Sequence, residues 1–262
     1  MPKFSNAYLI AIDAAIAASK AIMEIYQQEF SFQDKSDGSP VTKADLASSQ
    51  IIEQMLSPLG IPITGEESEK LPFEVRQHWT QCWCVDPLDG TKEFIKRNDE
   101  FAVNIALIEN GLPIFGLIAS PVQEKILMGS KNIGVFILEF EEVHHFDNWQ
   151  KLEIPRQSNK PRVMACSRSH HSGAVLQIIN ELKAQGHELD FIKKGSALKF
   201  FDLAEGRADI YPRFAPTMEW DIAAGHAILA AAGGRVSRLD NDQALRYGKP
   251  GFENPGFVAQ GL

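Results

Sequence analysis

The sequence predicts an α/β protein in which an α+β N-terminal half is followed by an α/β C-terminal half. Two helical patterns open the 262-residue chain, closely spaced strand patterns follow, and strands and helices then alternate to near the end. Neighbouring strands with short connections are typical of an antiparallel sheet, whereas strands separated by helices are typical of parallel units.

Helices are predicted for about residues 5–29 and 43–57, because apolar residues recur there at helical spacing. A polar loop with Gly and Pro separates them at 34–41. Short apolar runs then predict the strands of a largely antiparallel meander, at 61–64, 82–86, 101–109, 113–120, 125–129 and 134–138.

A polar, proline-bearing stretch at 148–160 predicts the boundary between two domains, at 1–155 and 156–262. Beyond it, strands are predicted at 162–166, 189–192 and 208–211, and each precedes a helix, at about 172–185, 196–205 and 221–232.

The composition narrows the class of partner. The formal net charge is −8 and no dense run of Lys and Arg is present, so polymeric nucleic acid is excluded, while a small polyanion is not. Cys82, Cys84 and Cys166 are too few and odd in number for a disulfide framework, and the first two are expected to be packed core thiols. Asp13 interrupts the only signal-like run, and no segment reaches about 20 apolar residues. We expect a cytoplasmic location, with peripheral attachment to the inner face of the membrane left open.

Acidic residues gather at the ends of three predicted elements, in the segments GEES at 65–68, DPLDGT at 86–91 and EWD at 219–221. Magnesium prefers oxygen ligands, and carboxylates from separate loops suit it. Any one segment is explained equally well by turn formers and helix caps. The three together favour a metal site.

The DPLDGT segment combines metal ligands with an anion-binding turn. Asp86 and Asp89 bracket Pro87, which fixes its own backbone angle after a strand. Gly90 allows close approach of the backbone to a ligand, and the following amides can accept a phosphate oxygen.

These segments resemble the inositol monophosphatase family, whose members are magnesium-dependent, lithium-sensitive phosphatases. A fourth motif supports the likeness: Trp220-Asp221 leads into an alanine-rich helix that ends at Ala232-Gly233-Gly234. The resemblance implies a layered αβαβα sandwich and two or three Mg²⁺ ions. It implies that most metal ligands belong to the N-terminal domain and the last to the C-terminal one: Glu66, Asp86, the backbone carbonyl of Leu88, Asp89 and Asp221.

By the same resemblance, Asp37 pairs with Thr91 to orient and deprotonate the attacking water, and Glu66 counts with them as catalytic. The loop at 39–45 lies near a third metal position. The roles of Glu67 and Lys35 stay open.

Within that family the chain looks most like the 3'(2'),5'-bisphosphate nucleotidases of the CysQ type, through DPLDGTKEF at 86–94, SRSH at 167–170, GSALKF at 195–200 and TMEWD at 217–221. The resemblance implies hydrolysis of adenosine 3',5'-bisphosphate, a by-product of sulfate assimilation, to AMP and phosphate. The substrate-binding residues it implies are Gly90, Thr91, Ser167, His170, Ser196, Lys199, Arg213 and Asp221.

A bisphosphorylated nucleotide also needs cations beyond the metal site, and Arg168, His170, Lys199 and Arg213 are candidates. Two alternatives stay open: an inositol or other small-polyol monophosphatase, which would not need these cations, and a catalytically silent nucleotide-binding module. The sequence does not define the oligomeric state.

Overall fold

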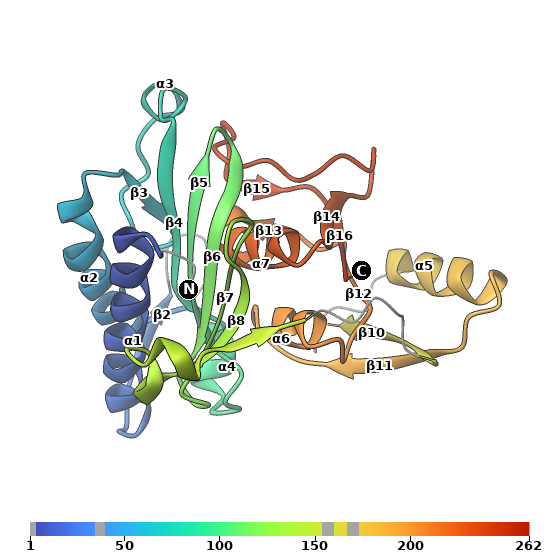
Figure 1. The fold of residues 1–262 in the computed structure, drawn as a ribbon, viewed down its shortest axis with the longest axis horizontal. Coiled ribbons are helices and arrows are strands. Elements are labelled where there is room, and N and C mark those ends of the chain that lie inside the picture. Colours follow the sequence, from blue (N-terminus) through green and yellow to red (C-terminus); the bar gives the residue numbers. More distant parts are fainter. Residues whose placement is uncertain (1–3, 35–39, 154–159, 167–172, 262) are drawn as a thin grey trace.

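The computed structural model describes residues 4–34, 40–153, 160–166 and 173–261, and its elements lie in five layers. Figure 1 shows helices α1 (Asn6–Tyr26) and α2 (Lys43–Leu56) on the outer face of a seven-stranded sheet. Helices α6 (Lys199–Ala204) and α7 (Glu219–Ala231) lie between this sheet and a five-stranded one, which α5 (Gly173–Ala184) covers. The predicted αβαβα sandwich is confirmed.

The seven-stranded sheet is an antiparallel meander except at one edge. In order its strands are β3 (Ile63–Gly65), β4 (Gln81–Asp89), β5 (Ala102–Glu109), β6 (Leu112–Ser120), β7 (Lys125–Ser130), β8 (Gly134–Glu139) and β9 (Gln150–Leu152). β3 runs parallel to β4, and the connection between them contains the short helix α3 (Phe73–Arg76).

Both faces of this sheet are buried, so its central strands read as continuous apolar runs. Trp83 and Val85 pack toward α1 and α2, whereas Cys82 and Cys84 pack toward α6 and α7. The two cysteines are free and buried, as expected for core thiols.

The five-stranded sheet has the order β11 (Leu189–Lys193), β10 (Arg162–Cys166), β12 (Ile210–Arg213), β16 (Phe257–Gln260) and β14 (Arg235–Arg238). The three strands predicted here are parallel to their neighbours. The last two were not predicted, and β16 inserts antiparallel between β12 and β14. The sheet is therefore mixed.

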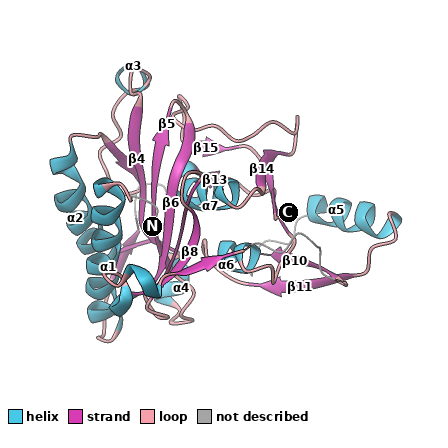
Figure 2. Cartoon of the chain, in the orientation of Figure 1, coloured by secondary structure: helices cyan, strands magenta, loops and turns pink. Residues whose placement is uncertain are grey.

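Short elements complete the chain (Figure 2): the hairpin of β1 (Phe32–Asp34) and β2 (Pro40–Thr42), the helix α4 (Thr91–Ile95), and the pair of β13 (Thr217–Met218) and β15 (Glu253–Asn254). Single turns of 3-10 helix occupy Ser57–Leu59, Phe140–Glu142 and Phe146–Asn148.

Two predicted helices differ in detail. α6 begins at Lys199 and not near 196, because Ser196 has a positive φ of 55° that an α-helix does not accommodate. α2 buries Asp45, Ser48 and Ser49 beside Ile52 and Leu56, a face next to the predicted apolar one.

The division of the chain near residue 155 stays a prediction, since α7 packs on β5 and β6 of the first sheet as well as on β14 of the second. Across the described parts of the chain, no helix combines the length and apolar character needed to cross a membrane.

Candidate active site

The C-terminal end of β4 carries Asp86, Leu88 and Asp89. The pairing of β4 with β5 changes register between Asp86 and Asp89, which is where Pro87 lacks the N–H that a regular ladder needs. The carbonyl of Pro87 accepts a hydrogen bond from Ser48 Oγ of α2 at 2.6 Å, and the amide of Leu88 donates to Asp86 Oδ1 at 3.1 Å. The predicted turn is therefore held from both sides.

Gly90 ends this turn with a φ of +96°, and a Cβ atom there would lie 2.9 Å from the carbonyl oxygen of Glu100. A side chain at this position would meet backbone, so glycine is required sterically. The first residue of α4, Thr91, follows directly.

Glu66 directly follows β3, next to β4. A Cβ atom on Gly65 would lie 2.0 Å from the carbonyl oxygen of Val85, so only glycine allows the two strands to approach this closely. The amide of Glu66 donates to the same carbonyl at 3.1 Å. Lys70 Nζ donates to the carbonyl of Glu66 at 2.6 Å and lies 4.9 Å from the Trp220 ring centroid, so it links this loop to α7.

Asp221 occupies the first turn of α7. Its Oδ2 accepts a hydrogen bond from the amide of Met218 at 2.9 Å, as in a helix cap. The carboxylate predicted from the 219–221 segment is thus fixed by the helix that follows it.

The four carboxylates are close enough to repel one another. Burial, followed by the charge of Glu66, raises the pKa of Asp86 well above its usual range, and Asp89 and Asp221 add to the shift. Burial, followed by the charge of Asp89, raises the pKa of Asp221 to about 8. Buried like charges of this kind favour a cation among them.

The chemistry of these donors fits magnesium, because every predicted ligand is an oxygen. Their present geometry is not a finished cluster: within the described ranges, no three acidic, His or Cys side chains converge as a metal site. Asp89 Oδ2 accepts bonds from Ser196 Oγ at 2.7 Å and the Ala197 amide at 2.5 Å. Each aspartate is therefore held by nearby protein donors.

Thr91 meets a buried aspartate on α2. Its hydroxyl donates to Asp45 Oδ1 at 3.0 Å and also lies 3.3 Å from the carbonyl oxygen of Leu88. The other oxygen of Asp45 accepts from the amide and the hydroxyl of Thr42, at 2.7 and 2.6 Å. Burial raises the pKa of Asp45. Sequence reasoning placed Asp45 near a metal but missed its pairing with Thr91.

A cavity of about 410 Å³ opens beside Asp89 and Asp221, lined by Asp89, Gly90, Lys92, Glu93, Lys96, Gly195, Ser196, Ala197, Lys199, Phe200, Tyr211, Arg213, Thr217, Asp221 and Ile222. It brings together predicted metal ligands and predicted substrate residues from both halves of the chain. Lys92 and Lys96 were not predicted, although their spacing of four residues after DGT is a signal for one helix face.

Lys199 is buried in the wall of this cavity. Its Nζ donates to the carbonyls of Ser196 at 2.5 Å and Lys194 at 3.2 Å, and lies 5.0 Å from the Tyr211 ring centroid. Burial lowers the pKa of Lys199 to about 8, against the opposing charge of Asp89. An ammonium has three donors, so one remains for a ligand.

Some predicted residues lie outside the described residues, namely Asp37, Ser167 and His170, together with Lys35 and Arg168. Their assignments stay predictions.

Comparisons with known proteins agree on one family. The sequence model of the "Inositol monophosphatase family" matches residues 4–259. The 3'(2'),5'-bisphosphate nucleotidase CysQ of Salmonella typhimurium is 40% identical over 244 residues, which cover 92% of this chain and 94% of that protein. The CysQ crystal structure from Bacteroides thetaiotaomicron superposes with a TM-score of 0.85 at 37% identity, covering 98% of this chain and 97% of that one. The suhB protein of Bartonella henselae, at 24% identity and a TM-score of 0.76, shares the fold over 98% of this chain and 94% of its own.

Proposed function

The chain belongs to the inositol monophosphatase family, and from this membership we propose that it is a magnesium-dependent 3'(2'),5'-bisphosphate nucleotidase. The substrate we propose is adenosine 3',5'-bisphosphate, hydrolysed to AMP and phosphate. The observation that carries the proposal is the cavity, where lysines and an arginine line the wall opposite the carboxylates of a relative-like metal site.

Two or three magnesium ions would be held by the carboxylates of Glu66, Asp86, Asp89 and Asp221 and by the carbonyl of Leu88. Bound there, they would lower the pKa of a coordinated water and neutralise charge on the phosphoryl oxygens. The protein's own contribution is the fixed placement of these oxygens by β3, the β4 bulge and the first turn of α7.

Asp45 and Thr91 would orient the attacking water. The hydroxyl of Thr91 donates to Asp45, so its oxygen lone pairs are directed at a water, whose proton can pass through Thr91 to the carboxylate. Burial favours this transfer because it raises the pKa of Asp45 toward neutrality. Asp37, the partner predicted from the sequence, stays a prediction for the same role.

Gly90 and Thr91 would bind the phosphate that is cleaved, and Ser196, Lys199 and Arg213 the one that is kept. Lys92 and Lys96 line the same cavity and add to its positive wall. A substrate with one phosphate would leave this wall unpaired, which is the physical basis for preferring a bisphosphate. The expected cytoplasmic location stays a prediction.

The test is phosphate release from adenosine 3',5'-bisphosphate by the wild-type protein and by Asp89→Asn, with and without magnesium. Wild-type release that requires magnesium, and its loss in a folded Asp89→Asn protein, are expected. Near-normal release by Asp89→Asn at saturating magnesium would contradict the metal site.

A further inference from the structure

A buried ion pair lies directly behind the first turn of α7, outside the cavity. Glu219, the first residue of the helix, is 1% exposed, and its Oε1 lies 2.7 Å from Lys249 Nζ. The amides of Gly248 and Lys249 also donate to this carboxylate, at 2.9 and 3.0 Å. A carboxylate this deeply buried is costly unless it is paired and hydrogen-bonded, and here it is both.

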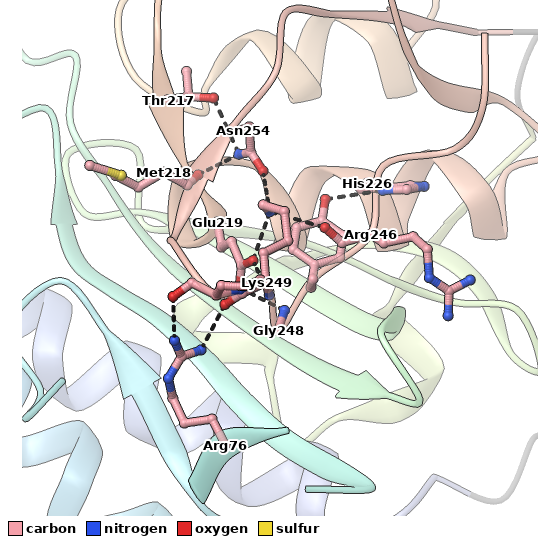
Figure 3. Close-up of polar contacts among 11 residues, drawn as sticks. Arg76, Thr217, Met218, Glu219, His226, Arg246, Gly248, Lys249 and Asn254 are labelled. Atoms are coloured by element: carbon pink, nitrogen blue, oxygen red, sulfur yellow. Dashed lines mark hydrogen bonds and ion pairs between the residues drawn. The ribbon is translucent and has the colours of Figure 1, made fainter. Parts of the chain in front are cut away.

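All three donors of the Lys249 ammonium are used. Besides Glu219, they reach Asn254 Oδ1 at 3.0 Å and the carbonyl of Arg246 at 3.0 Å (Figure 3). The lysine therefore ties three points of the chain together, and its bond to Glu219 has a defined direction.

Segment 246–254 holds the residues before α7 through backbone as well. Asn254 Nδ2 donates to the carbonyl of Met218 at 2.7 Å, and the amide of Glu219 donates to the carbonyl of Phe252 at 2.9 Å. Arg76 anchors the same segment to the first sheet, donating to the carbonyls of Lys249 and Pro250 at 3.2 and 3.0 Å (Figure 3).

Glu219 and Asp221 point to opposite sides of one helical turn. Two residues apart, they are separated by about 200° around a helix axis. Glu219 faces segment 246–254, and Asp221 lines the cavity. Fixing the direction of Glu219 therefore fixes the rotation of the first turn, and with it the place of Asp221.

We propose that Lys249, through Glu219, is a positioning residue that holds Asp221 in place for metal binding. The inference rests on the proposed function, since it takes Asp221 as a magnesium ligand. It makes segment 246–254 part of the site although none of its residues lines the cavity.

The experiment measures Mg²⁺ affinity directly, by calorimetry and by the Mg²⁺-dependent rise in unfolding temperature, with and without inorganic phosphate. For Lys249→Met we expect about a tenfold weaker affinity, the lower end of the range for residues that orient metal ligands. Glu219→Gln should have a similar effect, and the double variant should be no worse than either single one. At saturating Mg²⁺ the KM for adenosine 3',5'-bisphosphate should stay within about twofold, because the cavity wall is unchanged.

Arg207→Met is the matched control for lost stability. Arg207 pairs at 2.8 Å with Asp202, whose side chain is 3% exposed, as Glu219 is buried behind α7. This variant should keep wild-type Mg²⁺ affinity. An equal loss in Arg207→Met, or unchanged affinity in Lys249→Met, would overturn the inference.

Asn254→Ala decides the matter if Lys249→Met does not fold. It keeps the ion pair but removes one ammonium acceptor and the bond to Met218, so a smaller loss of Mg²⁺ affinity is expected and no loss would overturn the inference. Absence of Mg²⁺ binding in the wild type would instead remove the proposed function on which the inference rests.

Discussion

Replacing Lys199 with methionine removes one buried ammonium from the cavity while keeping its apolar stem. Lys199 is 3% exposed, and its two hydrogen bonds to carbonyls leave one donor for the phosphate that is not cleaved. This contact exists in both the ground and the transition state, so its loss should raise KM more than it lowers kcat.

The size of the effect follows from the kind of bond that is lost. A hydrogen bond to a charged group contributes about 1.5–3 kcal/mol, so KM for adenosine 3',5'-bisphosphate should rise about ten- to a hundredfold at pH 7. Lys194→Met is the matched control, because that neighbouring lysine pairs with Asp202 and does not line the cavity. Its KM should be unchanged.

The pH dependence gives a second readout. Lys199 carries its charge below its pKa of about 8, so wild-type kcat/KM for the bisphosphate should decline as pH rises through that value. The Lys199→Met protein should lack this decline. If the variant kept the same alkaline decline, or if it lost activity equally on inositol monophosphate, Lys199 would not be binding the second phosphate.

Three further outcomes are expected. Asp45→Asn should lower kcat by about a hundredfold or more with little change in KM, since it removes the proton acceptor behind Thr91; a near-normal kcat in a folded variant would exclude that role. The pKa of buried His226, whose Nδ1 lies 3.0 Å from the Tyr247 hydroxyl, is lowered by burial to about 4. The unfolded chain therefore binds this proton first as pH falls, and urea unfolding should show about 2 kcal/mol of stability lost between about pH 7 and 5, a loss that His226→Gln should reduce and that an unchanged slope would refute. Calcium should inhibit in competition with magnesium, because it fills oxygen sites with looser geometry; indifference of phosphate release to calcium would count against the metal ligands.

Local chemistry made the DPLDGT segment predictable. Pro87 interrupts a strand and Gly90 takes a positive φ, so the sequence alone indicates a strand, a turn and a helix start. The same holds for Gly65 beside Glu66, where glycine is needed for close strand packing.

Long-range pairing was not predictable in the same way. Asp45 and Thr91 are 46 positions apart, and Glu219 and Lys249 are 30 apart, so no periodic pattern connects either pair. The polar face of α2 was missed because a search for apolar spacing passes over buried Asp45, Ser48 and Ser49.

Short strands were missed for a related reason. β13 and β15 have two residues each, and β14 and β16 four, too few for an alternating pattern to stand out. Only their partners in the sheet define them.

The most direct test of the account is a side-by-side measurement of kcat/KM for adenosine 3',5'-bisphosphate and inositol 1-phosphate in saturating magnesium. Two contacts between the kept phosphate and the cationic wall predict a preference of about a hundredfold or more for the bisphosphate. Equal values, or a preference for the inositol phosphate, would contradict the assignment as a bisphosphate nucleotidase.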